Sequence, residues 1–356
     1  MATISMRLRM ASPRWCLPSP RGRSARPRSR CSSAAGTEPG THTVCVPSES
    51  EGIFMSVFRL LACLLIVLGL LCCPALAVDR LVFEGDSPYT GIQVYDKSDG
   101  LRYMQFGVYE QTVMRLSNPD FLHYAYTRSV MAGFAFAEPP IKRVLMLGLG
   151  GGAMAQFIAR KFPEVTLDII EIDPLVVEVA EKYFGFKPER NGQVQVGDGR
   201  RLLRKSGQVY DVIILDAYKA GGIPFHLTTR EFMEIVKNHL SPGGVAVIHL
   251  WAEYANKYLR AQVKTIASVF PYNYSFYDNE GSFNIFATQR DRWLTKSEVQ
   301  VRGERIGRER NFSFDLGQLI AEQYTDASQI PTRGLQGQIL TDDFAPVNLL
   351  KEQVVR

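Results

Sequence analysis

Cysteine is missing from most of this sequence. All six cysteines precede residue 74, and residues 74–356 contain none. Disulfide bonds, a catalytic thiolate and cysteine-ligated metal sites are therefore excluded from that part of the chain. A cysteine-free chain is compatible with an oxidising compartment but does not establish one.

The same part of the chain has no excess of positive charge. The formal net charge is +5 at pH 7, and residues 1–54, with eight Arg and three Glu, carry all of that excess. Beyond Arg59, acidic residues outnumber basic residues by one. Because nucleic-acid-binding surfaces are strongly basic, we expect no nucleic-acid partner.

Residues 1–54 also lack apolar periodicity. They are rich in Arg, Ser, Pro and Gly, a composition that predicts a disordered basic leader. Met55 opens a second apparent start, and we expect translation to begin there.

A long apolar run lies within residues 55–78. Arg59 is followed by an apolar core at 60–71 and then by the small-residue motif Ala75-Leu76-Ala77, which is typical of a secretory signal peptide. A retained membrane anchor is the alternative, because residues 60–78 are just long enough to span a bilayer. Either segment suggests the membrane or the periplasm, and an unused leader leaves the protein in the cytoplasm.

The most informative stretch is residues 143–173. A short apolar run at 144–147 leads into four glycines within five positions and then into helix-like residues at 153–161. The glycines are Gly148, Gly150, Gly151 and Gly152. Glycines let a backbone turn sharply and approach a ligand closely, and the N-terminus of the helix that follows attracts negative groups. This strand, turn and helix predict a nucleoside-binding α/β domain.

A second expected strand supports that prediction. Residues 166–170 end on Glu171 and Asp173, about twenty residues past the glycines, where a carboxylate can accept both hydroxyls of a ribose. The pattern Gly148-x-Gly150-x-x-Ala153 also satisfies the looser dinucleotide fingerprint. A nicotinamide or flavin enzyme is therefore an alternative at this point.

The chain beyond residue 78 divides into three expected parts. Residues 79–140 alternate apolar and polar positions between Gly, Pro and Asp-Gly turns and then become helix-like at 124–136, which predicts a small N-terminal antiparallel β-domain. Residues 141–290 alternate strands and helices and close with a hairpin within 272–287. That alternation predicts a Rossmann-like, doubly wound, mostly parallel sheet of an α/β catalytic domain. Residues 291–356 predict a C-terminal tail that covers the domain.

Acidic residues fall at the ends of the expected strands. Glu171 and Asp173 follow one strand, Asp198 with Gly199 follows the next, and Asp216 ends the fourth. Because ligands of such sheets bind beyond the carboxyl ends of the strands, we expect these acids to line one site. A nicotinamide enzyme explains neither Asp198 nor Asp216.

Five motifs, in this order and spacing, resemble the spermidine synthase family of polyamine aminopropyltransferases. They are L-G-L-G-G-G at 147–152, E-I-D at 171–173, G-D-G-R at 197–200, Y-D-V-I-I-L-D at 210–216 and L-S-P-G-G at 240–244. The tail motif T-D-D-F-A-P-V at 341–347 is similar to the spermidine synthase-like branch. The resemblance implies the fold of class I S-adenosylmethionine-dependent methyltransferases.

The resemblance also implies an activity. That family moves an aminopropyl group from decarboxylated S-adenosylmethionine to putrescine and leaves methylthioadenosine. Carried over by position, Glu171 holds the ribose hydroxyls, Asp198 holds the adenine amino group, and Asp216 is the base beside the attacking amine. The expected nucleoside site also contains Gly148, Gly150, Gly152, Asp173 and Gly199.

The chemistry agrees with these roles. Displacement at a carbon attached to a sulfonium needs a neutral amine, and a carboxylate can remove the proton from an alkylammonium and hold the amine in line. No metal is expected, because the sulfonium is already a good leaving group.

The expected acceptor residues come from several segments. Tyr89 belongs to the N-terminal part, Tyr218 follows Asp216, and His249 and Glu253 follow the fifth strand. Each of them also has an ordinary structural explanation as a loop or core residue. The expected partner is a small-molecule amine. Members of the family often dimerise, so a homodimer is an expectation from the resemblance alone.

Four departures from the family pattern bear on the reaction. Gly151 stands where the family carries the acid that meets the aminopropyl ammonium, and Lys219 stands in place of a second acid. Thr90 replaces a Gln, and Arg128 replaces a Glu. Fewer acids and more positive charge should disfavour a dicationic putrescine. Methyl transfer from S-adenosylmethionine on the same fold and a non-catalytic, membrane-associated ligand-binding module therefore stay open.

Overall fold

The computed structural model describes residues 79–344, except 189–191, 220 and 327–337. The expected leader at 1–54, the signal or anchor at 55–78 and the last residues of the tail lie outside this part. Among the described residues, no helix is both long and apolar enough to cross a membrane.

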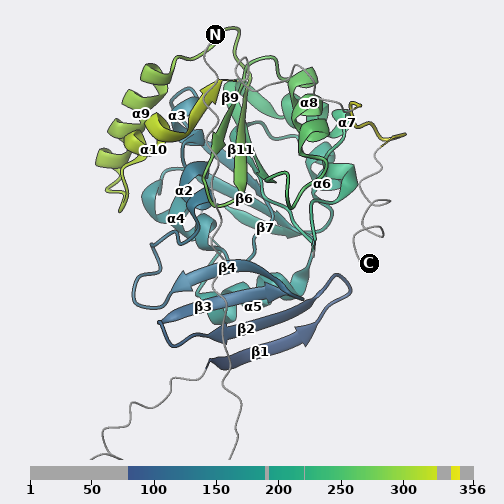
Figure 1. Ribbon diagram of the computed structural model, residues 1–356, viewed down its shortest axis with the longest axis vertical. Helices are drawn as coiled ribbons and strands as arrows, with labels where there is room; N and C mark the ends of the chain where they lie inside the picture. Colours follow the sequence, from purple (N-terminus) through teal and green to yellow (C-terminus); the bar gives the residue numbers. More distant parts are fainter. Residues whose placement is uncertain (1–78, 189–191, 220, 327–337, 345–356) are drawn as a thin grey trace, which may run out of the picture. The chain divides into compact units, whose positions relative to one another are not determined.

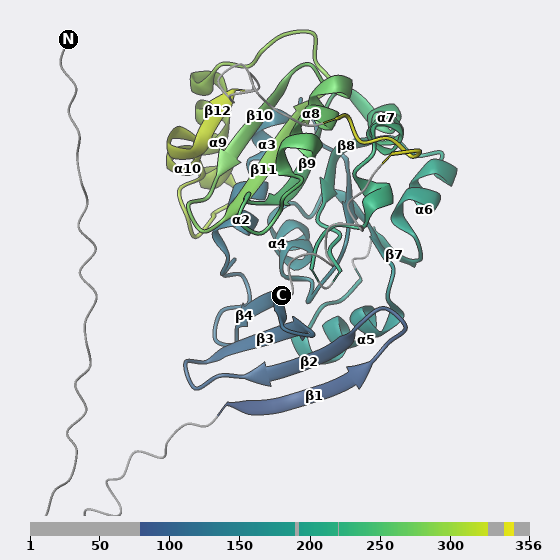
Figure 2. The same ribbon diagram turned by 45° about the vertical axis from the view of Figure 1, so that its right-hand side comes forward.

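The first described element is a four-stranded antiparallel sheet in the order β1-β2-β3-β4. Its strands are β1 (Arg80–Asp86), β2 (Gly91–Asp96), β3 (Leu101–Phe106) and β4 (Tyr109–Arg115). One face carries buried apolar side chains, among them Ile92, Val94 and Met104, which pack on Val176 and Val179 of α5 (Pro174–Phe184). Both views of the ribbon show this small sheet lying along α5 (Figures 1 and 2).

The second sheet has eight strands in the order β12-β10-β11-β9-β8-β5-β6-β7. They are β5 (Arg143–Leu147), β6 (Thr166–Glu171), β7 (Gln193–Val196), β8 (Tyr210–Leu215), β9 (Leu240–Trp251), β10 (Asn273–Tyr277), β11 (Ser282–Thr288) and β12 (Tyr324–Asp326). Strands β5 to β9 pair in parallel, and β11 turns antiparallel against β9. The predicted fold class, a mostly parallel sheet preceded by a small antiparallel one, is confirmed.

Helices cover both faces of this sheet (Figure 1). One face packs against α2 (Ala125–Val130), α3 (Gly133–Phe136), α4 (Ala153–Lys161), α9 (Lys296–Glu309) and α10 (Leu316–Gln323). The other face packs against α6 (Gly199–Lys205), α7 (Arg230–Asn238) and α8 (Leu259–Val269). The chain leaves β5 toward β6 on one side and reaches β8 on the other, so the strand order reverses at β5, where α/β sheets bind ligands.

The helix predicted over 124–136 is divided into α2 and α3. Gly133 lies so close to β9 that a Cβ atom there would be 2.6 Å from Cγ2 of Val247. The two helices are joined through Met131 and Ala132, whose N–H groups bond to the residue three positions earlier, and the absence of a side chain at Gly133 lets α3 lie against β9.

Phe136 anchors α3 in the larger core. Its ring is fully buried, and its centroid lies 4.8 Å from the Tyr274 ring and 4.7 Å from the Phe286 ring. Aromatic pairs at such distances add to the free energy gained from burying apolar area. The ring therefore joins the helical face to the antiparallel end of the sheet.

Replacing Phe136 with Ala should destabilise the protein by about 3–5 kcal/mol, because the cavity left among these rings cannot fully collapse. Denaturant unfolding followed by tryptophan fluorescence measures the change. The control Val301→Ala removes a side chain that is 60% exposed and should shift the free energy of unfolding by less than about 0.5 kcal/mol. Equal effects of the two substitutions would contradict this account of the core.

Candidate active site

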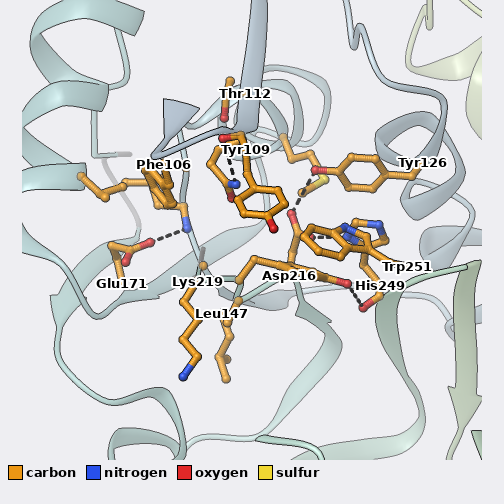
Figure 3. A pocket seen from close by; sticks show the side chains of 18 of the residues that line it. Phe106, Tyr109, Thr112, Tyr126, Leu147, Glu171, Asp216, Lys219, His249 and Trp251 are labelled. Carbon is orange, nitrogen blue, oxygen red and sulfur yellow. Dashed lines mark hydrogen bonds and ion pairs between the residues drawn. The ribbon is translucent and has the colours of Figure 1, made fainter. Parts of the chain in front are cut away.

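A cavity of about 770 Å³ opens at the carboxyl ends of β5, β6 and β8. The β3–β4 hairpin, the start of α2 and the ends of β9 and β11 complete its lining. Its size suits a nucleoside with an attached chain and a second small molecule. Figure 3 shows one part of this lining, where residues from the small sheet, α2 and the large sheet meet.

The glycine turn after β5 brings the strand ends together. Gly148 has φ +94°, and a Cβ atom there would lie 2.3 Å from the backbone oxygen of Asp216. Gly150 and Gly152 also have positive φ values, and Gly152 precedes the first turn of α4. Gly148 and Gly150 line the cavity, whereas Gly152 is not part of its lining. The turn therefore lets backbone, rather than side chains, form the floor.

Glu171 at the end of β6 is held from two sides. One carboxylate oxygen accepts the backbone N–H of Leu149 at 2.9 Å, and the other accepts that of Asp173 at 3.0 Å. Burial raises the pKa of Glu171 above its usual value, and these backbone hydrogen bonds only partly offset that rise. Each oxygen keeps a second lone pair, so the carboxylate can accept two hydroxyl groups from a ligand in the cavity.

Asp173 has mainly a structural set of contacts. Its side chain caps α5 by accepting the N–H of Leu175 at 2.9 Å, and it also accepts the hydroxyl of Ser87 from the small sheet. Asp173 also lines the cavity, and each of its oxygens has one partner. It joins the two sheets beside the position of the predicted nucleoside.

Asp198 follows β7 and also begins a helix. One oxygen caps α6 through the N–H of Arg201 at 2.7 Å, and the other lies 2.7 Å from Nε2 of His226. Gly199 packs so tightly that a Cβ atom there would lie 2.9 Å from Cδ2 of Leu147. Asp198, Gly199 and His226 all line the cavity.

The C-terminal segment supports this wall. Arg200 donates two hydrogen bonds to the Asp342 carboxylate, at 2.6 and 2.5 Å, and a third at 3.1 Å to the backbone oxygen of His226. Thr229 also donates to Asp342, at 2.8 Å. The Arg200 guanidinium holds the pKa of Asp342 below its usual value. The predicted tail motif therefore contacts the segment that carries His226.

Asp216 follows β8 directly and lines the same cavity. Nδ1 of His249 lies 2.7 Å from one of its oxygens, and the hydroxyl of Tyr126 donates a long hydrogen bond of 3.4 Å to the other. The Tyr126 and His249 rings stack with centroids 3.9 Å apart. Figure 3 shows the three side chains converging.

Aromatic rings continue from this cluster. Tyr218 donates its hydroxyl to the backbone oxygen of His249 at 3.0 Å and stacks on Trp251 at 4.8 Å. Tyr109 also stacks on Trp251, with the ring centroids 6.0 Å apart. Burial, together with the charge of Asp216, raises the pKa of Tyr126 and of Tyr218 well above the usual value. Both hydroxyls therefore stay protonated and act as donors at neutral pH.

The predicted acceptor residues divide into two groups. Tyr89, Tyr218 and His249 line the cavity, and Tyr89 is half exposed at its mouth. Glu253 is not part of the lining; its exposed carboxylate pairs with Arg260 at 2.9 Å. Sequence reasoning missed Trp251 and Tyr109, because an aromatic residue in a strand is most simply explained by packing.

The departures at 219 and 128 add less positive charge to the site than expected. Lys219 lines the cavity, but it is exposed, and Figure 3 shows its side chain running away from Asp216. Arg128 is not in the lining and donates to the backbone oxygens of Leu122 and His123. The acidic residues Glu110, Asp278 and Glu280 do line the cavity, so its acceptor side is suited to a cation.

Gly151 has no room for a side chain. Its N–H donates to the hydroxyl of Thr112 at 2.8 Å, and a Cβ atom would lie 2.7 Å from Cγ2 of Thr112 and 3.0 Å from the Phe184 ring. The absence of an acid at position 151 therefore follows from the close packing between β4 and the glycine turn.

Comparisons with known proteins agree with this geometry. Residues 123–278 match the model of the spermine/spermidine synthase domain. The chain is 33% identical over 282 residues to the polyamine aminopropyltransferase of Vibrio vulnificus, which covers 76% of this chain and 91% of that protein.

Solved structures are similar in fold. A probable spermidine synthase from Corynebacterium glutamicum has a TM-score of 0.61 and 20% identity, over 73% of this chain and 96% of that one. A spermidine synthase in complex with the transition state analogue AdoDATO has a TM-score of 0.59 and 20% identity, over 71% and 87%.

The buried carboxylate of Glu171 predicts a pH dependence of stability. Because the pKa of Glu171 is raised on folding, its contribution is present below the unfolded pKa and is lost as pH rises through the folded pKa. The melting temperature of the wild type minus that of Glu171→Gln, which does not titrate, should therefore fall as the pH rises above about 4, the usual pKa of Glu. A melting-temperature difference that increases with pH would contradict a raised pKa of Glu171.

Gly151→Asp should lower stability by about 1–3 kcal/mol, because the new side chain overlaps Thr112 and Phe184. The double variant Gly151→Asp/Thr112→Ala removes one of these contacts and should lose less stability than the sum of the two single changes. Thermal unfolding of the four proteins completes the cycle. Additive losses would mean that the two residues do not compete for space.

Proposed function

Because the chain belongs to the spermine/spermidine synthase family and is a transferase, we propose that it moves an aminopropyl group from decarboxylated S-adenosylmethionine to an amine. The observation that carries this proposal is that two carboxylates line one cavity. Glu171 is placed to accept ribose hydroxyls, and Asp216 lies among hydrogen-bond donors and aromatic rings.

The nucleoside half of the cavity suits an adenosyl group. Glu171 offers two free lone pairs to the ribose hydroxyls, and the backbone at Gly148 and Gly150 allows close approach. Asp198 and His226 stand together at the other end and can accept from and donate to the adenine edge. These residues fit the adenosyl part of the donor.

In the acceptor half, Asp216 removes a proton from the alkylammonium form of the acceptor. The freed nitrogen lone pair then attacks the carbon attached to sulfur, the carbon–sulfur bond breaks, and its electrons neutralise the sulfonium to a thioether. Tyr126 and His249 hold the two Asp216 oxygens in place during this step, which supplies the alignment that in-line displacement needs. The proton on Asp216 passes to solvent.

The walls around Asp216 suit an aliphatic amine that carries a second positive charge. Tyr109, Tyr218 and Trp251 offer aromatic faces to methylene groups and to ammonium groups. Glu110 and Glu280 offer carboxylates farther along the cavity. We propose a short diamine of the putrescine type as the acceptor.

One observation favours a second function. No acid fits at position 151, so the donor's terminal ammonium lacks the partner that the family resemblance implies. Methyl transfer from intact S-adenosylmethionine on the same fold is the second candidate.

Calorimetry on the full chain separates these functions. Decarboxylated S-adenosylmethionine should bind at least tenfold tighter than S-adenosylmethionine, a difference of about 1.4 kcal/mol in binding free energy. Glu171→Ala should weaken the binding of methylthioadenosine by at least tenfold. The opposite donor preference would favour methyl transfer. Binding of none of the three ligands would overturn both enzymatic proposals.

Turnover with putrescine, measured as methylthioadenosine formed, tests the role of Asp216. Asp216→Asn should lower kcat by about 100-fold or more, because general base catalysis is lost, while methylthioadenosine affinity stays within about twofold of the wild type. The control Glu253→Gln changes an exposed carboxylate outside the cavity and should leave kcat unchanged. A Glu253→Gln loss equal to that of Asp216→Asn would refute this assignment.

A further inference from the structure

We infer that Asn284 is a positioning residue for Asp216, acting through Tyr126 and His249. This inference rests on the proposed function, because it concerns the base of that reaction. Asn284 lies on β11, it is fully buried, and it is not part of the cavity lining. It therefore touches neither the donor nor the acceptor.

Asn284 and His249 are direct cross-strand neighbours. The antiparallel register of β9 and β11 places them opposite each other, so their side chains lie side by side on one face of the sheet. His249 is only 3% exposed and Asn284 is 0% exposed. The same face carries α2, which provides Tyr126.

Asn284 also holds Tyr126 directly. Its Nδ2 donates to the backbone oxygen of Tyr126 at 3.1 Å. Tyr126 in turn stacks on His249, and both residues contact the Asp216 carboxylate, one at each oxygen. A single buried amide thus holds the backbone of Tyr126, whose ring stacks on His249 beside Asp216.

Two atoms in this group have no hydrogen-bond partner within the described residues. They are Nε2 of His249 and Oδ1 of Asn284, and both are buried. Buried polar atoms without partners are rare, and these two belong to neighbouring side chains. They do not hydrogen-bond to each other, so Asn284 acts on this group through its hydrogen bond to the Tyr126 backbone, while Asp216 accepts the proton on Nδ1 of His249.

His249 is therefore held between the Asp216 carboxylate, at Nδ1, and the stacked ring of Tyr126. The titratable groups that contact it are Asp216, Tyr126 and Tyr218. With Nδ1–H directed at Asp216, the Tyr126 stack opposes rotation of the His249 ring, and Asn284 holds the backbone of Tyr126. Loss of Asn284 should leave the backbone of Asp216 unchanged but free its carboxylate to rotate.

The test compares two buried asparagines in the full chain. Asn273 on β10 is 1% exposed, donates from Nδ2 to the backbone oxygen of Phe270 at 2.6 Å and also has an unpartnered Oδ1. Asn284→Leu and Asn273→Leu should lower the melting temperature by similar amounts. Only Asn284→Leu should lower kcat, by tenfold or more, with methylthioadenosine affinity within twofold of the wild type.

Asn284→Asp keeps the size of the side chain but loses the donor to the Tyr126 backbone. It should therefore lower kcat as Asn284→Leu does. Equal kcat losses for Asn284→Leu and Asn273→Leu, or a loss confined to methylthioadenosine binding, would overturn the inference.

A spectroscopic measurement keeps the test independent of turnover. Long-range ¹⁵N–¹H spectra report which ring nitrogens of the five histidines carry protons, and His249→Gln assigns the signal of His249. Asn284→Leu should shift that signal, and Asn273→Leu should leave it in place. If the wild type transfers no aminopropyl group, the proposed function fails while this spectrum still decides the role of Asn284. An unshifted His249 signal in Asn284→Leu would overturn that role.

Discussion

The site depends on the way three parallel strands end side by side. The backbone oxygen of Leu147 accepts the N–H of Asp216 at 2.9 Å, and the N–H of Gly148 is donated to the oxygen of Ile170 at 2.8 Å. These two backbone hydrogen bonds set the spacing of β6, β5 and β8 at their carboxyl ends. Glu171 and Asp216 are consequently fixed on either side of one glycine turn. A side chain at 148 would separate the strands, because its Cβ atom would overlap the Asp216 carbonyl.

The small antiparallel sheet forms the part of the cavity wall that the parallel strands leave open. Ser87 donates to Asp173, Thr112 accepts the N–H of Gly151, and Arg102 donates to the backbone oxygen of Tyr183 at 2.6 Å. Each contact joins the small sheet to the glycine turn or to α5. The cavity wall is therefore built from two sheets, and the packing that closes it is the same packing that leaves no room for an acid at Gly151.

The sequence was sufficient for the fold class and for the placement of Glu171, Asp198 and Asp216 in one cavity, because strand periodicity and the residues at strand ends are local properties. Other features depend on contacts between distant segments. Tyr126 reaches Asp216 from α2, which the expected continuous helix at 124–136 did not reveal. Glu253 lies only two residues beyond the end of β9, yet its carboxylate points to Arg260 rather than to the cavity. The register of β11, which brings Asn284 beside His249, has no signature in either strand alone.

The contacts of the C-terminal segment have a consequence for synthesis of the chain. Leu340 accepts the N–H of Arg230 at 2.8 Å and donates to Thr265 at 2.9 Å, and Asp342 binds Arg200. These partners lie on or beside α6, α7 and α8, far earlier in the sequence. During translation the parallel strands, Glu171 and Asp216 leave the ribosome well before residues 340–342. The wall beside Asp198 is thus completed at a late stage, and a nascent chain that has already formed its sheet still lacks the support of His226.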